Sequence, residues 1–461
     1  MGQVRHEEDE QMRGPRGNWV LTVAALALVA GVSAACSSPS SSSSTTTTTT
    51  SATTATTSGG SSSSSAPGVS KTQIDVATIS SKTGPLAGYF DGISPGMNAY
   101  FQMINAKGGI NGRKIVITAD LDDGGSPTQF TQQVHTAIDQ DHVFAVGVAS
   151  AWFTPNYFVA TNTPTYGYNV SSNWETAPNL FAAGGSTQFY SPGVPSLAHV
   201  IKATGSKSVA VISYGQSIAA SYDACNAFAT QLKAAGYNIS FVDVSAQLSG
   251  AYASDVQRMQ QAGSDMLVSC MEGSDDITLA RDIQQYGLKI KQVWFNGYDQ
   301  TLLNQYSSVM QGVYINLNGN VPFEAGTAPK YGNTYPGMKQ YLAAMKKYEP
   351  AFIYNGVAFQ GWQSAALLAQ GIQAAGANLT QAAVVNATNK ITDFSGGGVS
   401  TPVNWTVSHT SFTEPNCTAN VQVQGTTFVP VLATGKQVFV CVGPNARNPV
   451  PVTPPVGTPG A

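Results

Sequence analysis

From Thr72 onward, short apolar segments alternate with segments of helical periodicity. "IDVATIS" and "VFAVGVAS" are short and apolar, whereas "SPGMNAYFQMINAKGG" places Met97, Phe101 and Ile104 on one helical stripe. Strands that alternate with helices are typical of a largely parallel sheet covered by helices. The sequence therefore predicts an α/β fold.

The same alternation begins a second time near residue 207. "SVAVISY", "ISFVDVS" and "DMLVSCM" are predicted strands, and "DACNAFATQLKAAGYN" and "YASDVQRMQQAG" between them are predicted helices. Two such cycles indicate two successive α/β lobes. The later helix "NGVAFQGWQSAALLAQGIQAAG" is assigned to the first lobe and the hairpin "FVPVLATGKQVFVCV" to the second. We therefore expect the chain to cross between the lobes more than once.

The N-terminus has the features of an export signal. An apolar run from Trp19 to Ala35 precedes Cys36. This run is about 17 residues long and rich in Ala, which favours a cleaved signal peptide, with an uncleaved membrane anchor as the alternative. Acidic residues at positions 7–10 occupy the region that is positively charged in signal peptides, whereas a start at Met12 leaves two arginines there. We therefore expect translation to begin at Met12.

Cys36 lies in "GVSAAC", which resembles a bacterial lipobox except that Ser33 occupies the position where Leu is preferred. Residues 37–70 are mostly Ser and Thr, so they bury no core and are predicted to form a flexible tether. With a signal peptide at residues 1–36, this predicts an extracytoplasmic protein that is anchored to the cell membrane through a lipid on Cys36. The Pro-rich residues 444–461 are predicted to be disordered.

Four further cysteines follow the lipobox cysteine. An even number of cysteines in an exported chain indicates disulfides, and four of them allow three pairings. We favour Cys225 with Cys270 and Cys417 with Cys441, because each pair lies within one local segment. Four reduced, buried thiols are the alternative.

The composition disfavours several classes of function. Charged residues make up 10% of the chain and the formal net charge is −3, so no basic surface is expected that could hold nucleic acid. The five histidines have no metal-binding spacing, and the Gly-rich segments match neither the phosphate-binding nor the dinucleotide-binding pattern. We expect no metal and no cofactor.

Ser94 lies in Gly92-Ile93-Ser94-Pro95-Gly96, which matches the G-x-S-x-G pattern of serine hydrolases. A nucleophile elbow needs a strand directly before the serine, whereas a helical stripe follows this one. Ser at the N-cap with Pro at the first helical position is instead a common helix start. We therefore predict a helix cap at Ser94, and no catalytic candidate remains for an enzyme.

The segment "TGPLAGYFDGISPGMNAYFQMINAKGGINGRKI", followed by "DLDDGGSPTQF", resembles the N-terminal lobe of the leucine/isoleucine/valine-binding proteins. These are the type 1 periplasmic solute-binding subunits of ABC importers, and the similarity covers roughly residues 72 to 440. The resemblance implies two doubly wound α/β lobes joined by a hinge that the chain crosses several times. It places lobe 1 at residues 71–190 and 316–400, and lobe 2 at residues 191–315 and 401–443.

The resemblance also implies a function. A monomer of this family binds a small polar solute, such as a branched-chain or other amino acid, by closing its lobes, and delivers it to an ABC permease in the cytoplasmic membrane. The alternative is a ligand-sensing module of the same fold that passes a signal to a membrane partner. Neither implies catalysis.

Candidate contacts in the first lobe follow from the same resemblance. Tyr89 matches the aromatic residue of the family's first cleft loop. Ser150, Ala151 and Trp152 lie in the loop that holds an amino-acid carboxylate in the family, although the family's serine falls on Ala151. Asn169 corresponds loosely to a further contact. Packing beside the hinge is the alternative for Tyr89 and Trp152.

Candidate contacts in the second lobe include two acids. Tyr214 and Gln216 are placed at the rim of the cleft, and Glu272 falls where the family has a ligand-facing tyrosine. Tyr298 and Asp299 lie where the family has the glutamate that pairs with the substrate ammonium. An unpaired ammonium in a closed cleft is costly, so an amino-acid ligand needs Glu272 or Asp299 as its counter-ion. If neither points inward, the ligand is not an α-amino acid, and solvated loop acids are the alternative for both.

Overall fold

The computed structural model describes residues 66–184, 194–407, 409 and 417–460. The predictions for the signal peptide and for Cys36, and nearly all of the predicted tether, lie outside these residues. Within the described ranges, no helix combines the length and the apolar character needed to cross a membrane.

The first sheet is parallel throughout and has the strand order β2-β1-β3-β4-β5. Its strands are β1 (Gln73–Ser80), β2 (Lys114–Asp122), β3 (Ala145–Ala149), β4 (Thr165–Gly167) and β5 (Leu180–Ala182). The segments between them are α1 (Ile93–Asn105), α2 (Pro127–His135), the π-helical η1 (Thr136–Gln140), α3 (Asn156–Thr161) and the 3-10 turn η2 (Ser172–Glu175).

The second sheet is 8-stranded, with the order β12-β11-β10-β9-β8-β6-β7 and β13 paired to β11. Strands β6 to β10 are parallel and the last three are antiparallel. The strands are β6 (Val209–Tyr214), β7 (Ile239–Ala246), β8 (Met266–Ser269), β9 (Lys291–Trp294), β10 (Tyr314–Asn316), β11 (Cys417–Gln424), β12 (Thr427–Val431) and β13 (Phe439–Cys441). The intervening segments are α4 (Pro195–Ala203), η3 (Gln216–Ile218), α5 (Ala219–Ala234), α6 (Ala253–Gln261), α7 (Gly273–Gln285) and α8 (Gln300–Tyr306).

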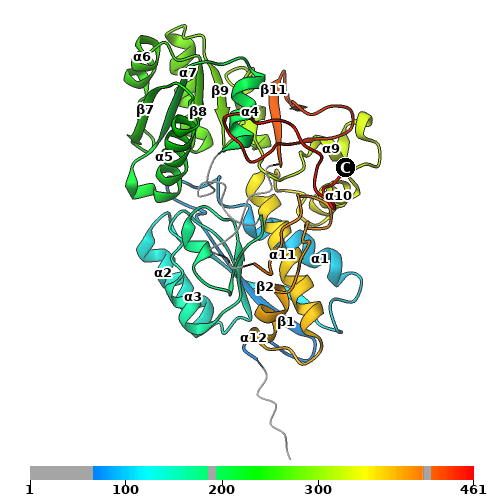
Figure 1. Cartoon of the computed structure of the whole chain (residues 1–461). Helices are drawn as coiled ribbons and strands as arrows, with labels where there is room; N and C mark the ends of the chain where they lie inside the picture. The colour runs from blue at the N-terminus through cyan, green and yellow to red at the C-terminus, as the bar shows by residue number, and fades with distance from the viewer. Residues whose placement is uncertain (1–65, 185–193, 408, 410–416, 461) are drawn as a thin grey trace, which may run out of the picture. The chain divides into compact units, whose positions relative to one another are not determined.

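Alternating side chains of β6 explain why helices cover both faces of this sheet (Figure 1). Val209 and Val211 join the apolar cluster that contains residues of α4 and α5. Ala210 and Ile212 point to the opposite face and join the cluster with residues of α6 and α7. A strand that is buried on both faces is expected to be mainly apolar, as β6 is apart from the buried Ser213 and the hydroxyl of Tyr214.

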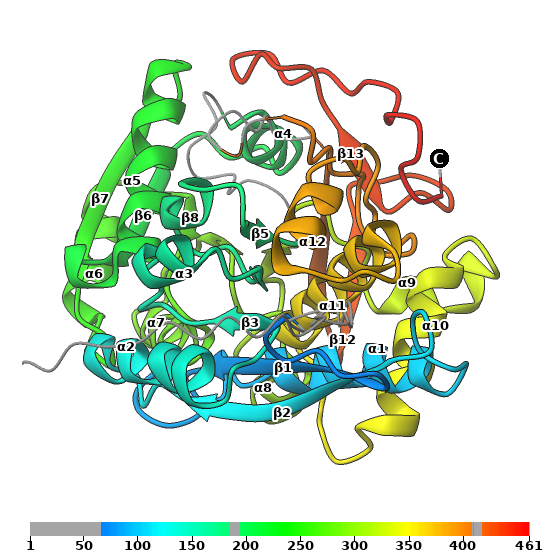
Figure 2. The same cartoon turned by 90° about the horizontal axis from the view of Figure 1, so that it is seen from below.

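The chain returns to the first sheet before it finishes the second. After β10 come α9 (Glu324–Thr327), η4 (Pro329–Tyr331), α10 (Pro336–Tyr348), α11 (Gly356–Ala375) and α12 (Gln381–Thr388). Residues of α11 and α12 pack in the apolar cluster of β1 and α1, and β11 to β13 then complete the second sheet (Figure 2). The predicted fold class of two α/β lobes with repeated crossing is confirmed, while the residue boundaries of the lobes stay a prediction.

Helix α1 corrects the prediction for Ser94. The helix begins at Ile93, its N-cap is Gly92, and no side chain caps it. Gly92 already has helical dihedral angles, φ −72° and ψ −17°, so Ser94 lies inside the first turn instead of before it. The predicted cap at Ser94 is therefore wrong.

Close packing of α1 on α11 depends on Gly96. A Cβ at this position would overlap the backbone carbonyl oxygen of Ala358 in α11, and backbone atoms cannot rotate away. We expect Gly96→Ala to lower the free energy of unfolding by about 2 kcal/mol, because overpacking forces two helices apart. Chemical denaturation measures this loss. Ser94→Ala, in the same turn but without a capping bond, serves as the control and should change stability by less than about 0.5 kcal/mol. Equal effects of the two substitutions would contradict this account of the helix contact.

The disulfides Cys225–Cys270 and Cys417–Cys441 confirm the favoured pairing. The first joins α5 to the end of β8, and the second joins β11 to β13. The C-terminal residues that were predicted to be disordered make contacts with the second lobe. Lys202 donates a 2.7 Å hydrogen bond to the Arg447 carbonyl, and Val442 pairs with Pro451. A Pro-rich composition disfavours helices and sheets, but it leaves backbone carbonyls that can accept such bonds.

Candidate ligand-binding cleft

A cavity lies where strands of both sheets end. Parallel α/β sheets place ligand sites beyond the carboxyl ends of their strands, and the loops after β3, β4, β6, β8, β9 and β10 all contribute here. We call this cavity the aromatic chamber. Its lining residues are Leu86, Tyr89, Phe90, Ala151, Tyr168, Val170, Tyr214, Ile218, Ala220, Ser221, Ala224, Cys270, Glu272, Phe295, Asn296 and Asn318.

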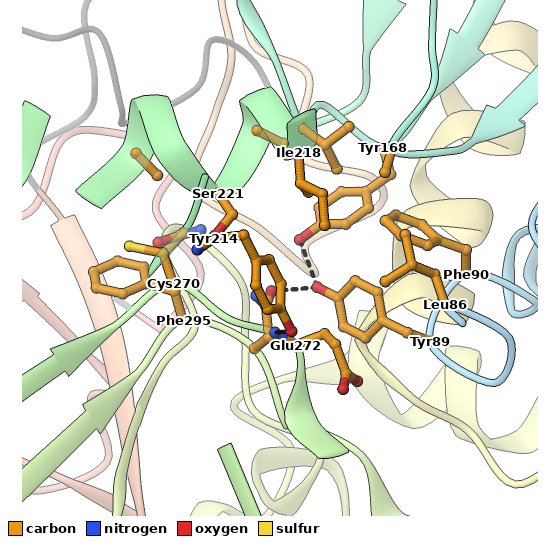
Figure 3. Close-up of a pocket in the computed structure, with 16 residues that line it drawn as sticks. Leu86, Tyr89, Phe90, Tyr168, Tyr214, Ile218, Ser221, Cys270, Glu272 and Phe295 are labelled. Carbon is orange, nitrogen blue, oxygen red and sulfur yellow. Dashed lines mark hydrogen bonds between the residues drawn. The ribbon is translucent and has the colours of Figure 1, made fainter. Parts of the chain in front are cut away.

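Tyr89 connects the two lobes at the centre of this chamber (Figure 3). Its hydroxyl lies 3.1 Å from the Tyr168 hydroxyl and donates a hydrogen bond to the Asn296 side-chain carbonyl in the second lobe. The amide nitrogen of Asn296 donates in turn to the Met271 carbonyl at 2.7 Å. Burial, together with Tyr168, raises the pKa of Tyr89 well above its usual range, so this hydroxyl keeps its proton. The bond to Asn296 holds the lobes against each other.

A second cavity adjoins the first, and the two share Tyr89, Tyr168, Phe295, Asn296 and Asn318. We call it the amide chamber because side-chain amides dominate its polar lining. The lining is completed by Gly297, Tyr298, Asp299, Asn316, Leu317, Asn320, Val321, Asn355, Gly356, Val357, Phe359 and Gln360.

Glu272 caps helix α7. Its carboxylate accepts hydrogen bonds from the backbone of Ser274 at 3.0 Å and of Asp275 at 2.8 Å, and from the Ser274 hydroxyl. Burial raises its pKa, which these hydrogen bonds counteract. In Figure 3 the carboxylate points away from the Tyr89 hydroxyl. Glu272 thus lines the chamber, but its charge is directed to the start of a helix.

Asp299 has the same arrangement at helix α8. Its carboxylate accepts hydrogen bonds from the backbone of Thr301 and Leu302, and it lines the amide chamber. Burial raises its pKa. An acid directly before a predicted helix is an N-cap signal that the sequence contains at both Glu272 and Asp299. Both acids that were predicted as counter-ions for an ammonium group therefore already accept hydrogen bonds from the backbone of a helix.

Ser150 is buried and forms hydrogen bonds only within the first lobe as far as the described residues show. It donates to the Asp123 carboxylate and accepts from the Trp152 backbone at 3.0 Å. Ala151 lines the aromatic chamber, whereas Trp152 packs against the apolar clusters beside it. In the loop after β3, Ala151 therefore presents its methyl group to the cavity, whereas the Ser150 side chain is directed into the first lobe.

Of the remaining predicted residues, some line a chamber and others do not. Tyr214 lines the aromatic chamber and donates to Asp275 at 2.6 Å, whereas Gln216 is exposed and Ile218 takes the place on the wall. Asn169 lies between two lining residues, Tyr168 and Val170, and is not itself among them. The binding roles of all these residues stay predictions.

Tyr298 lines the amide chamber and donates a 2.9 Å hydrogen bond to Glu324. Burial raises the pKa of Glu324 to about 7. The folded state keeps this proton up to about pH 7, but an ordinary glutamate loses it near pH 4.5. The resulting stability is complete below pH 4.5 and is lost as the pH rises through 7. We expect a loss of about 2 kcal/mol, allowing for partial exposure of the side chain.

Glu324→Gln should remove this loss, because glutamine still accepts the Tyr298 bond and has no proton to release. Unfolding free energies measured from pH 4 to 8 test the prediction. Asp141→Asn, at an exposed acid, is the control and should keep the slope of the unsubstituted protein. The same slope in both variants would mean that Glu324 does not control it.

Sequence reasoning missed most of the chamber wall. Phe90, Tyr168, Phe295, Asn296 and Asn318 all lie within a few residues of an element end, which is the only sequence signal that they carry. Within the described ranges, no cluster of three or more His, Cys, Asp or Glu side chains is placed to hold a metal ion.

The sequence model of the family described as "Periplasmic binding protein" matches residues 73–426. The chain belongs to this family. The relative named "Leu/Ile/Val-binding protein homolog 3" from Brucella melitensis is 24% identical over 325 residues, which cover 68% of this chain and 82% of the relative. Members of the family bind substrates for transporters outside the cytoplasm.

Solved structures share the fold. A fatty acid ABC transporter substrate-binding protein from Thermomonospora curvata has a TM-score of 0.67 at 18% identity, covering 85% of this chain and 97% of its own. A branched chain amino acid ABC transporter protein from Thermus thermophilus, solved with bound valine, has a TM-score of 0.63 at 17% identity and covers 79% and 96%. Together with the family match, these similarities confirm the predicted type 1 periplasmic binding protein fold.

Proposed function

We propose that this chain is the extracytoplasmic solute-binding component of an ABC importer, and that it is a carrier and not an enzyme. The observation that supports this most directly is the aromatic chamber, which is lined from both lobes and crossed by the Tyr89–Asn296 hydrogen bond. A solute held between the lobes contacts both of them, so it favours the closed arrangement over the open one. Closure would then present the loaded form to a permease in the membrane.

The relatives support the transport role. The names of the Brucella melitensis relative and of the Thermus thermophilus structure refer to amino acids. The name of the Thermomonospora curvata protein refers to a fatty acid. Transport by this fold therefore extends to chemically different solutes. We propose that the chain acts as a monomer that delivers one small solute at a time.

A thermal-shift screen tests solute binding. The full-length chain is heated with amino acids, amides, short peptides, fatty acids and aromatic acids in turn, and a solute that binds the folded state raises the melting temperature. We expect at least one such solute, which should also quench or enhance the protein's aromatic fluorescence. A melting temperature unchanged by every solute would argue against a carrier.

We also propose that Cys36 is acylated, that the signal peptide before it is removed, and that residues 37–70 form the tether. Cys36→Ala is then expected to move the protein from the membrane fraction to the soluble extracytoplasmic fraction, because a lipid chain supplies the membrane affinity. Fractionation and immunoblotting measure this. Ser33→Leu, which brings the motif closer to the lipobox, is the control and should leave the protein in the membrane fraction. Retention of the Cys36→Ala variant in that fraction would point to an uncleaved anchor.

A further inference from the structure

We propose that the solute of this cleft is an uncharged amphiphile, with its apolar part in the aromatic chamber and a neutral hydrogen-bonding group at the amide chamber. This rests on the proposed carrier function and names the chemical class of its solute. Three features of the chambers carry the inference: their charges, their helix starts and their unpaired amides.

The chambers contain no cationic side chain among their described lining residues, and their acids are already engaged by helices. Of the described residues that line them, none is Lys, Arg or His, and the acids are Glu272 and Asp299. Each of these carboxylates already accepts two backbone N–H groups of its own helix. An ammonium group brought into the closed cleft would lose its water and would have to share these carboxylates with the helix N–H groups. The cleft therefore disfavours amines and zwitterions.

Helix starts, the usual alternative for binding an anion, are also occupied. The N-termini of α7, α8 and α11 face the two chambers, and they are capped by Glu272, Asp299 and Asn355. These caps already accept N–H groups in the first turns of their helices, so fewer free donors remain for a solute carboxylate. Helix α5 lacks a side-chain cap and brings Ser221 to the wall, so a carboxylate is included in the test below.

Neutral polar groups, in contrast, have unused partners. The side-chain nitrogen of Asn316 and the side-chain oxygen of Asn318 are buried and have no hydrogen-bond partner among the described residues. Asn316 is only 2% exposed, and Asn318 lines both chambers. One free donor and one free acceptor at this place match a group that both accepts and donates, such as a carboxamide or a hydroxyl.

The aromatic chamber fits the apolar part of such a solute. Leu86, Phe90, Val170, Ile218 and Phe295 give it a wall of aliphatic and aromatic carbon. Apolar surface moved from water into this wall supplies affinity, and the amides of the adjoining chamber supply orientation.

Matched series of probes test the class by varying only the charge. The first series is 3-phenylpropanamide, 3-phenylpropanoate, 3-phenylpropylamine and phenylalanine; the second is 4-methylpentanamide, 4-methylpentanoate, 4-methylpentylamine and leucine; the third is decanamide, decanoate and decylamine. Affinities for the full-length chain are measured at pH 7 by calorimetry. We expect the amide to bind at least about tenfold more tightly than each charged member of its series.

The outcomes of these measurements distinguish a failure of the proposed solute class from a failure of the proposed carrier function. A carboxylate, amine or zwitterion that binds more tightly than its amide overturns the uncharged class but leaves a carrier. The same holds if no amide binds while a charged solute raises the melting temperature in the general screen. If no solute of any kind binds, the carrier function itself falls.

A charge placed in the chamber wall tests where the solute lies. Ile218→Lys should shift the ratio of amide to carboxylate affinity at least about tenfold toward the carboxylate, since it adds the missing cation. Ser217→Lys, at the exposed preceding residue, is the control and should leave the ratio unchanged. If the folded Ile218→Lys protein keeps the ratio of the unsubstituted protein, the solute does not occupy the aromatic chamber. If Ile218→Lys does not fold, the probe series alone decide the proposal.

Discussion

Replacing Cys225 and Cys270 together by alanine is expected to lower the free energy of unfolding by about 4 kcal/mol. The bond links residues that are 45 positions apart, and opening a loop of this length restores chain entropy to the unfolded state. Both residues are buried, so alanine fits their surroundings without adding a polar group. Urea unfolding without reductant measures the loss.

The same double variant should bind solute less tightly, because Cys270 lines the aromatic chamber and the disulfide fixes the start of α7 beside α5. Alanine at Cys417 and Cys441 is the matched control. That bond spans 24 positions, so a similar loss of about 3.5 kcal/mol is expected, but neither cysteine lines the chamber. Equal weakening of binding in both double variants would show that general destabilisation, and not the chamber wall, is responsible.

Ala220→Trp is expected to weaken solute binding by roughly 100-fold or more, which corresponds to about 3 kcal/mol. Ala220 lies in the first turn of α5, lines the aromatic chamber and packs against the apolar cluster of the first lobe. An indole at this position would fill space that the solute needs and would obstruct the contact between the lobes. The tightest-binding solute of the thermal-shift screen, titrated by calorimetry, measures the effect.

Thr230→Trp controls for the cost of placing tryptophan in this helix, because Thr230 is on the exposed side of α5. It should keep the affinity of the unsubstituted protein. Both variants should unfold within about 1 kcal/mol of each other, since a tryptophan in a helix is only modestly unfavourable. Undiminished affinity in a folded Ala220→Trp protein would mean that the solute binds outside the aromatic chamber.

Much of the fold was predictable because the signal is local. The apolar segments that became β1, β3, β6 and β8 are buried on both faces, so their composition alone identifies them. The disulfide pairs were predictable because each joins neighbouring segments. The cap at Ser94 was mispredicted, since the start of α1 depends on where Gly92 meets α11, a contact between residues far apart in the sequence.

The candidate site was predictable only at the level of loops. The resemblance indicated the loops after β3, β6, β8 and β9, and the chamber is indeed built from them. Within the loops a residue one or two positions away lines the wall: Tyr168 in place of Asn169, and Ile218 in place of Gln216. Which of two adjacent side chains faces a cavity depends on the local backbone direction, which sequence similarity at this level does not determine.

The sequence by itself indicated the two α/β lobes and the repeated crossing, because apolar periodicity is a property of short segments. It favoured the disulfide pairing through local spacing, and its N-terminal motifs resembled the family. The tertiary structure alone decided the use of the two acids. Glu272 and Asp299 are suitable counter-ions for an ammonium by residue type, yet each begins a helix and accepts that helix's first N–H groups. Only the folded chain brings Tyr89 to Asn296 and places Asn316 and Asn318 beside them, since these contacts join residues from different lobes. The proposal of an uncharged solute rests on that arrangement.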